Sequence, residues 1–345
     1  MNSPTSSPAP AGRAVLLDCT LRDGSYAVNF QFTQRDTARL CVAIEQAGID
    51  LIEIGHGLGL GASGPRYGIA FETDEDYMTA ASDSLKRAKW GAFFIPGIGT
   101  ADDIRRAVDH GMGFLRIGTE VETWERIQPF AEQAKAAGLL VCANLMKSYA
   151  VDPVQAGKVA AAIDAWGTCD SIYIVDSAGC MLPDDVRQYV DAMKQACACD
   201  IGFHGHNNLD LANANCLVAL EAGAVYVDGS IRGMGRSAGN AQTEVLAFFL
   251  KKRGYPLDVD PFVLFEAGEK VIAPINVQAQ GLPPLDIVIG MARFHTSHMP
   301  RFRRAAEEHD IDLRRLILEV SSVDCVNPPD ALIQSVARDL GRIDD

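Results

Sequence analysis

Short apolar runs alternate with longer amphipathic segments along most of this chain. Each run holds four to seven residues, is rich in Val, Ile, Leu and Phe, and is bounded by Gly, Pro, Asp or Ser. Runs of this length and composition are typical of buried β-strands. The predicted strands are Val15–Asp18, Leu51–Gly55, Gly91–Pro96, Phe114–Gly118, Leu140–Met146, Ser171–Ser177, Ile201–His206 and Val225–Ser230.

The segments between these runs have apolar residues at helical spacing. Eight strands alternating with eight helices is the count of an α/β (β/α)₈ TIM barrel. A doubly wound open sheet is the rival fold, but it usually has fewer units and a dinucleotide-binding fingerprint. The predicted helices are Thr33–Ala47, Thr73–Ala88, Ala101–His110, Trp124–Ala137, Pro153–Trp166, Pro183–Ala196, Leu209–Ala222 and Ala241–Lys252.

Helix start and stop signals fit this reading. Thr100 with acids after it, and Asp152 followed by Pro153, are typical first turns, because a side-chain oxygen caps the free N–H groups there. Several segments end in Ala-Gly or His-Gly, and a glycine just past the last turn is the commonest helix terminator. We expect Gly48 and Gly223 to hold such positions.

The alternation stops beyond Tyr255-Pro256. The remainder has helical patterns at Pro261–Ala273, Ile287–His298, Arg301–His309, Leu313–Val320 and Pro329–Leu340. We therefore predict a disordered leader over residues 1–13, a TIM-barrel domain over 14–260 and a small helical C-terminal domain over 261–345.

Composition and charge narrow the function. The chain has 345 residues, 48% of them hydrophobic and 22% charged, with a formal net charge of −14. Such an acidic chain argues against binding to nucleic acid, and no apolar run is long enough to span a membrane. The nine cysteines are scattered without C-x-x-C spacing, and the first residues lack the features of a signal peptide. We expect a cytoplasmic protein without a disulfide framework.

Candidate metal ligands stand at the ends of the predicted strands, where barrel enzymes carry their active sites. His204 and His206 are two residues apart on one strand, so they point to the same face. An acid following the first strand would complete an Asp/His/His set suited to Mg²⁺, Mn²⁺, Co²⁺ or Zn²⁺. Two solvated or capping histidines are the plainer alternative, and a non-haem iron oxygenase is disfavoured because its usual H-x-D spacing is missing.

Five motifs together resemble the DRE-TIM metallolyases, and within them the 4-hydroxy-2-oxovalerate aldolases. The resemblance runs from the first strand nearly to the end of the chain, and the motif set is specific. The motifs are Thr20–Gly24 (TLRDG), Ile52–Gly57 (IEIGHG), Asp176–Gly179 (DSAG), His204–Asn207 (HGHN) and Gly233–Asn240 (GMGRSAGN).

The resemblance implies a class II pyruvate aldolase that cleaves or forms a 4-hydroxy-2-oxo acid through the enolate of pyruvate held at a divalent metal, most readily Mn²⁺ or Mg²⁺. It places Asp23, His204 and His206 on the metal, with Asn240 as a further ligand or a residue behind the ligands. Arg22 would neutralise the enolate, and Ser177 would bind the substrate carboxylate, again as the resemblance implies.

The chain also departs from the aldolase pattern. Tyr26 stands where the family has a histidine, and His295 stands near a family tyrosine, so the two acid–base residues look exchanged. Histidine titrates near ~6.5 and tyrosine near ~10, so we expect His295 to be the proton shuttle and Tyr26 a hydrogen-bond donor. Lys147, Phe93 and Ile95 replace other residues around the substrate, which favours an acceptor aldehyde with a polar or anionic group.

Several alternatives remain at this point. Gly59–Gly64 satisfies the G-x-G-x-x-G pattern of a dinucleotide site, although no helix pattern opens after it. Lys147 could instead form a Schiff base, as in a metal-independent aldolase. A Claisen-type 2-oxo acid or acyl-CoA synthase or lyase of the same superfamily is a further rival, but those lyases carry a cysteine that Gly233–Gly239 lacks.

A different class of function is a non-catalytic subunit that binds an aldehyde dehydrogenase. The 4-hydroxy-2-oxovalerate aldolases pair with an acylating aldehyde dehydrogenase, so the resemblance implies such a partner. It also implies a homo-oligomer, most simply a dimer, whose substrates are a 2-oxo acid and an aldehyde.

Overall fold

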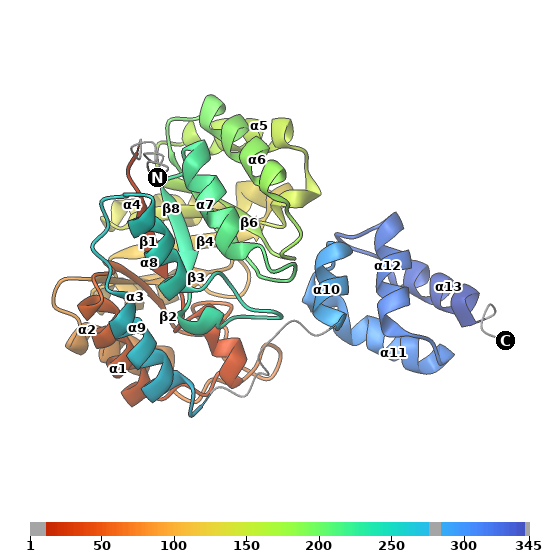
Figure 1. Ribbon diagram of the computed structural model, residues 1–345, viewed down its shortest axis with the longest axis horizontal. Helices are drawn as coiled ribbons and strands as arrows, with labels where there is room; N and C mark the ends of the chain where they lie inside the picture. The colour runs from red at the N-terminus through yellow and green to blue at the C-terminus, as the bar shows by residue number, and fades with distance from the viewer. Residues whose placement is uncertain (1–11, 276–283, 342–345) are drawn as a thin grey trace, which may run out of the picture.

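The computed structural model describes residues 12–275 and 284–341, and its main body is a closed barrel of eight parallel strands (Figure 1). The strands follow one another around the ring in chain order, and β1 pairs with β8 to close it. The predicted TIM barrel is therefore confirmed. The strands are β1 Val15–Asp18, β2 Leu51–Ile54, β3 Lys89–Phe94, β4 Phe114–Glu120, β5 Leu140–Met146, β6 Ser171–Asp176, β7 Asp200–Gly205 and β8 Tyr226–Gly229.

A helix follows each strand and covers the outside of the barrel (Figure 1). Thr100 and Asp152 cap the helices that they precede, as predicted, by accepting hydrogen bonds from the N–H groups of Asp103 and Gln155. The barrel helices are α1 Gln34–Gln46, α2 Asp74–Ser84, α3 Ala101–Asp109, α4 Gln128–Ala136, α5 Pro153–Asp164, α6 Pro183–Ala196, α7 Ala212–Ala222 and α8 Thr243–Lys252.

The inside of the barrel is filled in layers, because alternate residues of each strand point inward. An apolar layer near the amino ends of the strands includes Leu17, Phe114 and Tyr173. Two residues further along the strands, the inward positions become charged: Glu53, Arg116 and Asp228 are all fully buried. His204 on β7 stands in register with this charged layer, so the polar site rests on a closed apolar floor.

Beyond the barrel the chain is helical, with α9 Pro261–Ala267, a π-helical turn over Gly268–Ile272, then α10 Pro284–Met291, α11 Met299–His309, α12 Leu313–Val323 and α13 Asp330–Gly341. Helix α9 packs against α1 and α8 of the barrel. By contrast, residues of α10–α13 form an apolar cluster of their own around Phe294, Phe302 and Leu316. The division of the chain at residue 260 stays a prediction, and the packing of α9 favours a later boundary. The expected leader over residues 1–13 falls almost wholly outside the described residues.

The unit formed by α10–α13 lies against the carboxyl ends of the strands, with α10 nearest to the barrel (Figure 1). The ammonium of Lys147, just after β5, lies 3.4 Å from the carbonyl oxygen of Val326. Asn327 donates to Glu120, the last residue of β4, over 3.4 Å. The C-terminal helices therefore stand at the end of the barrel where strand-end chemistry is found. Among the described residues, no helix is long and apolar enough to cross a membrane.

Candidate metal centre and substrate pocket

Asp23, His204 and His206 converge at the carboxyl end of the barrel. One ligand atom from each lies within 4.8 Å of the others, and all three side chains are buried. The strand alternation puts both imidazoles on the inside, and the tight turn after β1 brings the carboxylate to them across β8. This is the donor set that the sequence predicted, and one carboxylate with two imidazoles suits a divalent ion.

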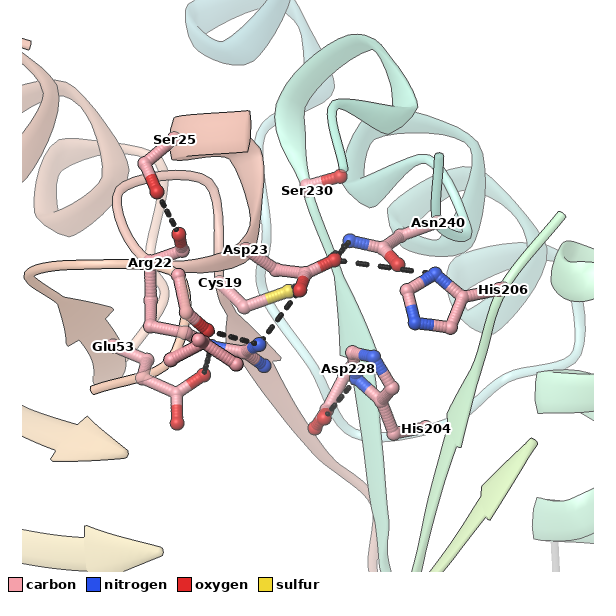
Figure 2. A network of polar contacts seen from close by, with 12 residues as sticks. Cys19, Arg22, Asp23, Ser25, Glu53, His204, His206, Asp228, Ser230 and Asn240 are labelled. Atoms are coloured by element: carbon pink, nitrogen blue, oxygen red, sulfur yellow. Dashed lines mark hydrogen bonds and ion pairs between the residues drawn. The ribbon is translucent and has the colours of Figure 1, made fainter. Parts of the chain in front are cut away.

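Residues behind the two histidines fix their ring orientation. Nδ1 of His204 lies 2.8 Å from Oδ2 of Asp228 (Figure 2). Nδ1 of His206 lies 3.3 Å from the carbonyl oxygen of Gly239. Both acceptors favour a proton on Nδ1, which leaves the lone pair on Nε2 for a metal. Burial lowers the pKa of His206 to about 3, only partly offset by Asp23, so this imidazole is neutral at neutral pH.

Asn240 provides a test of whether the site fits a metal. Its amide nitrogen donates to Oδ2 of Asp23 over 2.7 Å and to the carbonyl oxygen of Met234 over 3.0 Å. Its Oδ1 is buried and has no hydrogen-bond partner among the described residues. A buried oxygen without a partner costs free energy, which a cation beside it would offset. The donor set and this oxygen together fit a divalent ion.

A chain of buried ion pairs connects two of the candidate ligands, and Figure 2 shows its members Arg22, Glu53 and Asp228. Arg22 donates to Oδ1 of Asp23 and to Oε2 of Glu53, each over 2.7 Å. Arg116 donates to the same Glu53 oxygen over 3.0 Å and also pairs with Asp228, which holds His204. Burial alone would raise the pKa of Asp23, but Arg22 and the two histidines outweigh it and hold that pKa well below its usual range.

A pocket opens above the metal centre with an empty volume of about 410 Å³, part of it open to solvent. Besides the three candidate ligands, the predicted residues that line it are Arg22, Tyr26, Phe93, Ile95 and Ser177. The guanidinium carbon of Arg22 lies 4.8 Å from the centroid of the Phe93 ring. Oγ of Ser177 accepts a hydrogen bond from the N–H of Lys147 over 2.9 Å, which leaves the hydroxyl hydrogen to donate into the pocket.

Lys147 was predicted as a substrate contact, but the structure does not bring its side chain into this pocket. Its ammonium pairs with Oε1 of Glu120 at 2.7 Å and points to the C-terminal helices. The backbone at Lys147 has a φ of 54°, outside strand geometry, so the strand alternation does not govern its side chain. In this position the ammonium lies outside the pocket, where it cannot form a Schiff base with a bound 2-oxo acid.

His295 precedes the short 3₁₀ turn Thr296–His298 and is half-buried. Burial, followed by the nearby charges of Arg236 and Lys147, lowers its pKa well below the usual range. Its Nδ1 accepts a hydrogen bond from the N–H of Ser297 over 3.2 Å, so in the neutral ring Nε2 carries the proton. The role of His295 as proton shuttle stays a prediction; in this hydrogen-bonded state the neutral ring presents Nε2–H as a hydrogen-bond donor.

Arg236 is a pocket residue that the sequence analysis did not single out. It lies in the glycine-rich loop after β8 and lines the same pocket, with its guanidinium carbon 5.8 Å from the centroid of the Tyr26 ring. The signal was a lone basic residue inside the Gly233–Asn240 motif, between two glycines that follow a strand.

The glycine run at Gly59–Gly64 does not open a helix. It ends in a loop in which Gly64 bridges to Gly68, and α2 begins only at Asp74. A Cβ at Gly59 would lie 2.0 Å from the carbonyl oxygen of Phe93, so this glycine is needed for close packing of the loop on β3. The geometry therefore supports a packed loop and offers no phosphate-binding helix start.

An eight-stranded barrel with Asp and His ligands at its carboxyl end defines a class of metal-dependent barrel enzymes. Within that class the chain belongs to the HMGL-like family, whose model matches residues 13–271. This confirms the resemblance to the DRE-TIM metallolyases. Members of this family depend on a divalent metal ion.

The chain is similar over almost its full length to curated aldolases. The 4-hydroxy-2-oxovalerate aldolase 2 of Rhodococcus jostii is 38% identical over 328 residues, which cover 95% of each chain. The 4-hydroxy-2-oxovalerate aldolase of Carboxydothermus hydrogenoformans is 39% identical over 327 residues, covering 95% of this chain and 97% of the relative.

Two solved structures share the fold. The HMG-CoA lyase of Bacillus subtilis superposes with a TM-score of 0.67 at 18% identity, covering 81% of this chain and 98% of the other. The carboxyl transferase domain of Rhizobium etli pyruvate carboxylase, solved with pyruvate, gives 0.76 at 15% identity, covering 97% of this chain and 62% of the other. At these identities the likeness concerns the fold alone.

Proposed function

We propose that this protein is a divalent-metal-dependent aldolase, a carbon–carbon lyase that cleaves a 4-hydroxy-2-oxo acid to pyruvate and an aldehyde, or catalyses the reverse condensation. The observation that carries this proposal is the convergence of Asp23, His204 and His206 beside Arg22 in one buried pocket. Near full-length similarity to curated aldolases supports the reaction class.

A divalent ion held by these ligands would supply a Lewis acid for the ketone and carboxylate of a 2-oxo acid. Arg22 places a fixed positive charge beside the same centre, held by its bonds to Asp23 and Glu53. Such a preorganised cation stabilises the negative charge that develops on the enolate oxygen after the C–C bond breaks.

We assign substrate binding to other residues that line the pocket, and proton transfer to His295, which belongs to the C-terminal unit and is not among the lining residues. Ser177 can donate its hydroxyl hydrogen to the 2-oxo acid carboxylate, since its oxygen already accepts from the backbone. Tyr26 lines the same pocket, and burial raises the pKa of its hydroxyl, so it stays protonated and can donate a hydrogen bond. We assign His295 to proton transfer at the 4-hydroxyl, and Phe93 and Ile95 to contact with the aldehyde half.

The test is condensation of pyruvate with a panel of aldehydes, read by product mass after the protein has been stripped with a chelator and reloaded with one metal at a time. We expect activity only after reloading, highest with Mn²⁺ or Mg²⁺ and lower with Co²⁺ or Zn²⁺. Full activity in the chelator, or trapping of pyruvate on Lys147 by borohydride, would show a metal-independent mechanism instead.

The same measurement separates the rival functions. A Claisen-type enzyme would need an acyl-CoA in place of the aldehyde, and a non-catalytic subunit would release no pyruvate with any metal. We further propose a cytoplasmic homodimer that pairs with an acylating aldehyde dehydrogenase, which the near full-length similarity to the aldolases supports. Light scattering of the purified protein and copurification of a dehydrogenase from the native host test these two points.

A further inference from the structure

Arg236 brings a second cation into the substrate pocket. The side chain is half-buried in the loop that follows β8, on the same side of the pocket as Tyr26, which follows β1. Ser177 follows β6, so the strand that carries His204 and His206 lies between Ser177 and Arg236. A substrate whose 2-oxo carboxylate is held at Ser177 and the metal centre therefore has Arg236 at a separate place on the wall.

The other cations around this pocket are neutralised by acids. Arg22 pairs with Asp23 and Glu53, while the ammonium of Lys147 pairs with Glu120. The ion pairs that the described residues form do not include Arg236. Its side chain lines the same pocket as Asp23, His204 and His206.

Counting the charges around the pocket shows that Arg236 needs an anionic partner. The ion-pair chain beneath the site carries one net negative charge, because its three carboxylates outnumber its two guanidinium groups. A divalent ion changes this to one positive charge, which a single substrate carboxylate cancels. Arg236 then remains without a counter-charge, and a half-buried guanidinium is stabilised by a carboxylate that it can bind in a fork.

We propose that Arg236 binds a second carboxylate, carried by the aldehyde half of the substrate. The preferred substrates are then 4-hydroxy-2-oxo dicarboxylic acids, made from pyruvate and an aldehyde that bears its own carboxylate. This inference rests on the proposed aldolase function and names the class of aldehyde that this function leaves open. It also replaces the expectation that Lys147 recognises an anionic acceptor.

The experiment compares aldehydes of equal shape and different charge. Glyoxylate is paired with 2-methylpropanal, and succinic semialdehyde with 4-methylpentanal, so that an isopropyl group replaces each carboxylate. For the metal-loaded protein with pyruvate we expect kcat/KM to favour the acid of at least one pair roughly 10- to 100-fold, the range of a hydrogen-bonded charge. Arg236→Met should remove this preference, whereas Arg236→Lys should retain part of it.

Exchange of the C3 protons of pyruvate for deuterium serves as a separate readout, because it reports enolate formation without any aldehyde. It should be unchanged within about threefold in Arg236→Met, which also controls for folding. Arg253→Met removes a charge from an exposed ion pair at the end of α8 and should change neither measurement. Lys147→Met should keep the preference for the acid.

Several outcomes would overturn the inference. One is a wild-type protein that prefers the neutral aldehyde of both pairs, and another is an equal loss for acid and neutral aldehydes in Arg236→Met. A rise confined to the KM for pyruvate would assign Arg236 to the 2-oxo carboxylate instead. If C3 exchange is absent with every metal, the proposed function itself fails, whereas exchange without an acid preference leaves that function standing and removes only this inference.

Discussion

His206 shows how a single buried side chain couples the metal centre to stability. Its pKa is lowered to about 3 by burial, whereas an unfolded histidine titrates near ~6.5. Between these values the unfolded chain binds more protons than the folded one, so stability is lost as the pH falls. We expect the metal-free protein to lose stability from about pH 7 to pH 5, and His206→Gln to lose about 2 kcal/mol less over the same interval.

Urea unfolding at both pH values, in the presence of a chelator, measures this difference. His56 and His298 have pKa values shifted in the same direction, so the variant should retain part of the pH dependence. Burial raises the pKa of Asp18 to about 6, so protonation of Asp18 adds stability as the pH falls. Because both proteins contain Asp18, it does not affect the difference between them. If the parent and His206→Gln lose the same stability between pH 7 and pH 5, the lowered pKa of His206 is not a cause of the pH dependence.

The sequence could predict the convergence of the candidate ligands because period-two alternation and a strand end are local properties. The strand pattern was enough to pair His204 with His206, whereas the choice of Asp23 among the acids near β1 came from the family resemblance of the Thr20–Gly24 motif. Lys147 and Arg236 could not be placed in this way. Lys147 has left-handed backbone, and Arg236 lies in a loop whose glycines Gly233 and Gly239 have φ values of 64° and 87°. Which way such side chains point depends on tertiary packing.

At the scale of elements, the strands were predictable because each is buried on both faces and reads as an apolar run. The exceptions within those runs are informative, since Glu53, Arg116 and Asp228 interrupt three of them at one level of the barrel. Charged residues at this depth persist only where they neutralise one another. The sequence pattern alone did not indicate this layer, because only the closed ring brings the three side chains into contact.

Arg116 holds this charged layer together, and its removal should destabilise the barrel. Arg116→Met leaves Glu53 with one guanidinium and Asp228 with none, so we expect unfolding to become easier by roughly 3–5 kcal/mol. Denaturant unfolding of the metal-free protein measures this loss. The double variant Arg116→Met with Asp228→Asn should be less destabilised than the sum of the two single variants, since it leaves no unpaired Asp228 carboxylate. If the free energy of unfolding falls by less than about 1 kcal/mol, water or local rearrangement must replace the contacts that Arg116 makes with Glu53 and Asp228.

At the scale of the whole molecule, the helices α10–α13 are a separate apolar cluster seated on the carboxyl end of the barrel. Sequence patterns predicted these helices but not their position on the barrel, because helical periodicity does not indicate which surface a helix packs against. The docking includes polar contacts at the ends of β4 and β5 and a close packing contact after β7. A Cβ at Gly290 of α10 would lie within 3.0 Å of Leu209 and Asn208 in the loop after β7. A close backbone approach of this kind is not visible in an amphipathic pattern.

Lys147 contacts both the barrel and the C-terminal helices. Its ammonium holds Glu120 at 2.7 Å and Val326 at 3.4 Å, and Nε2 of His298 lies 2.8 Å from the same Val326 carbonyl oxygen. Loss of this ammonium should free the turn before α13 and, through His298, the segment that carries His295. We therefore expect Lys147→Met to speed amide hydrogen exchange in residues 294–328 by about tenfold, while the barrel strands keep their protection.

Lys135→Met is the matched control, because Lys135 forms a similar ion pair with Asp170 at 2.6 Å within the barrel and away from the C-terminal helices. Exchange resolved by mass spectrometry on peptic fragments distinguishes the two variants. An unchanged exchange rate in residues 294–328 of Lys147→Met would mean that apolar contacts of α10, such as that of Gly290 with Leu209, are enough to hold the helices in place. Because His295 belongs to the docked unit, faster opening should also lower turnover without changing the metal affinity, which links this contact to the acid–base step.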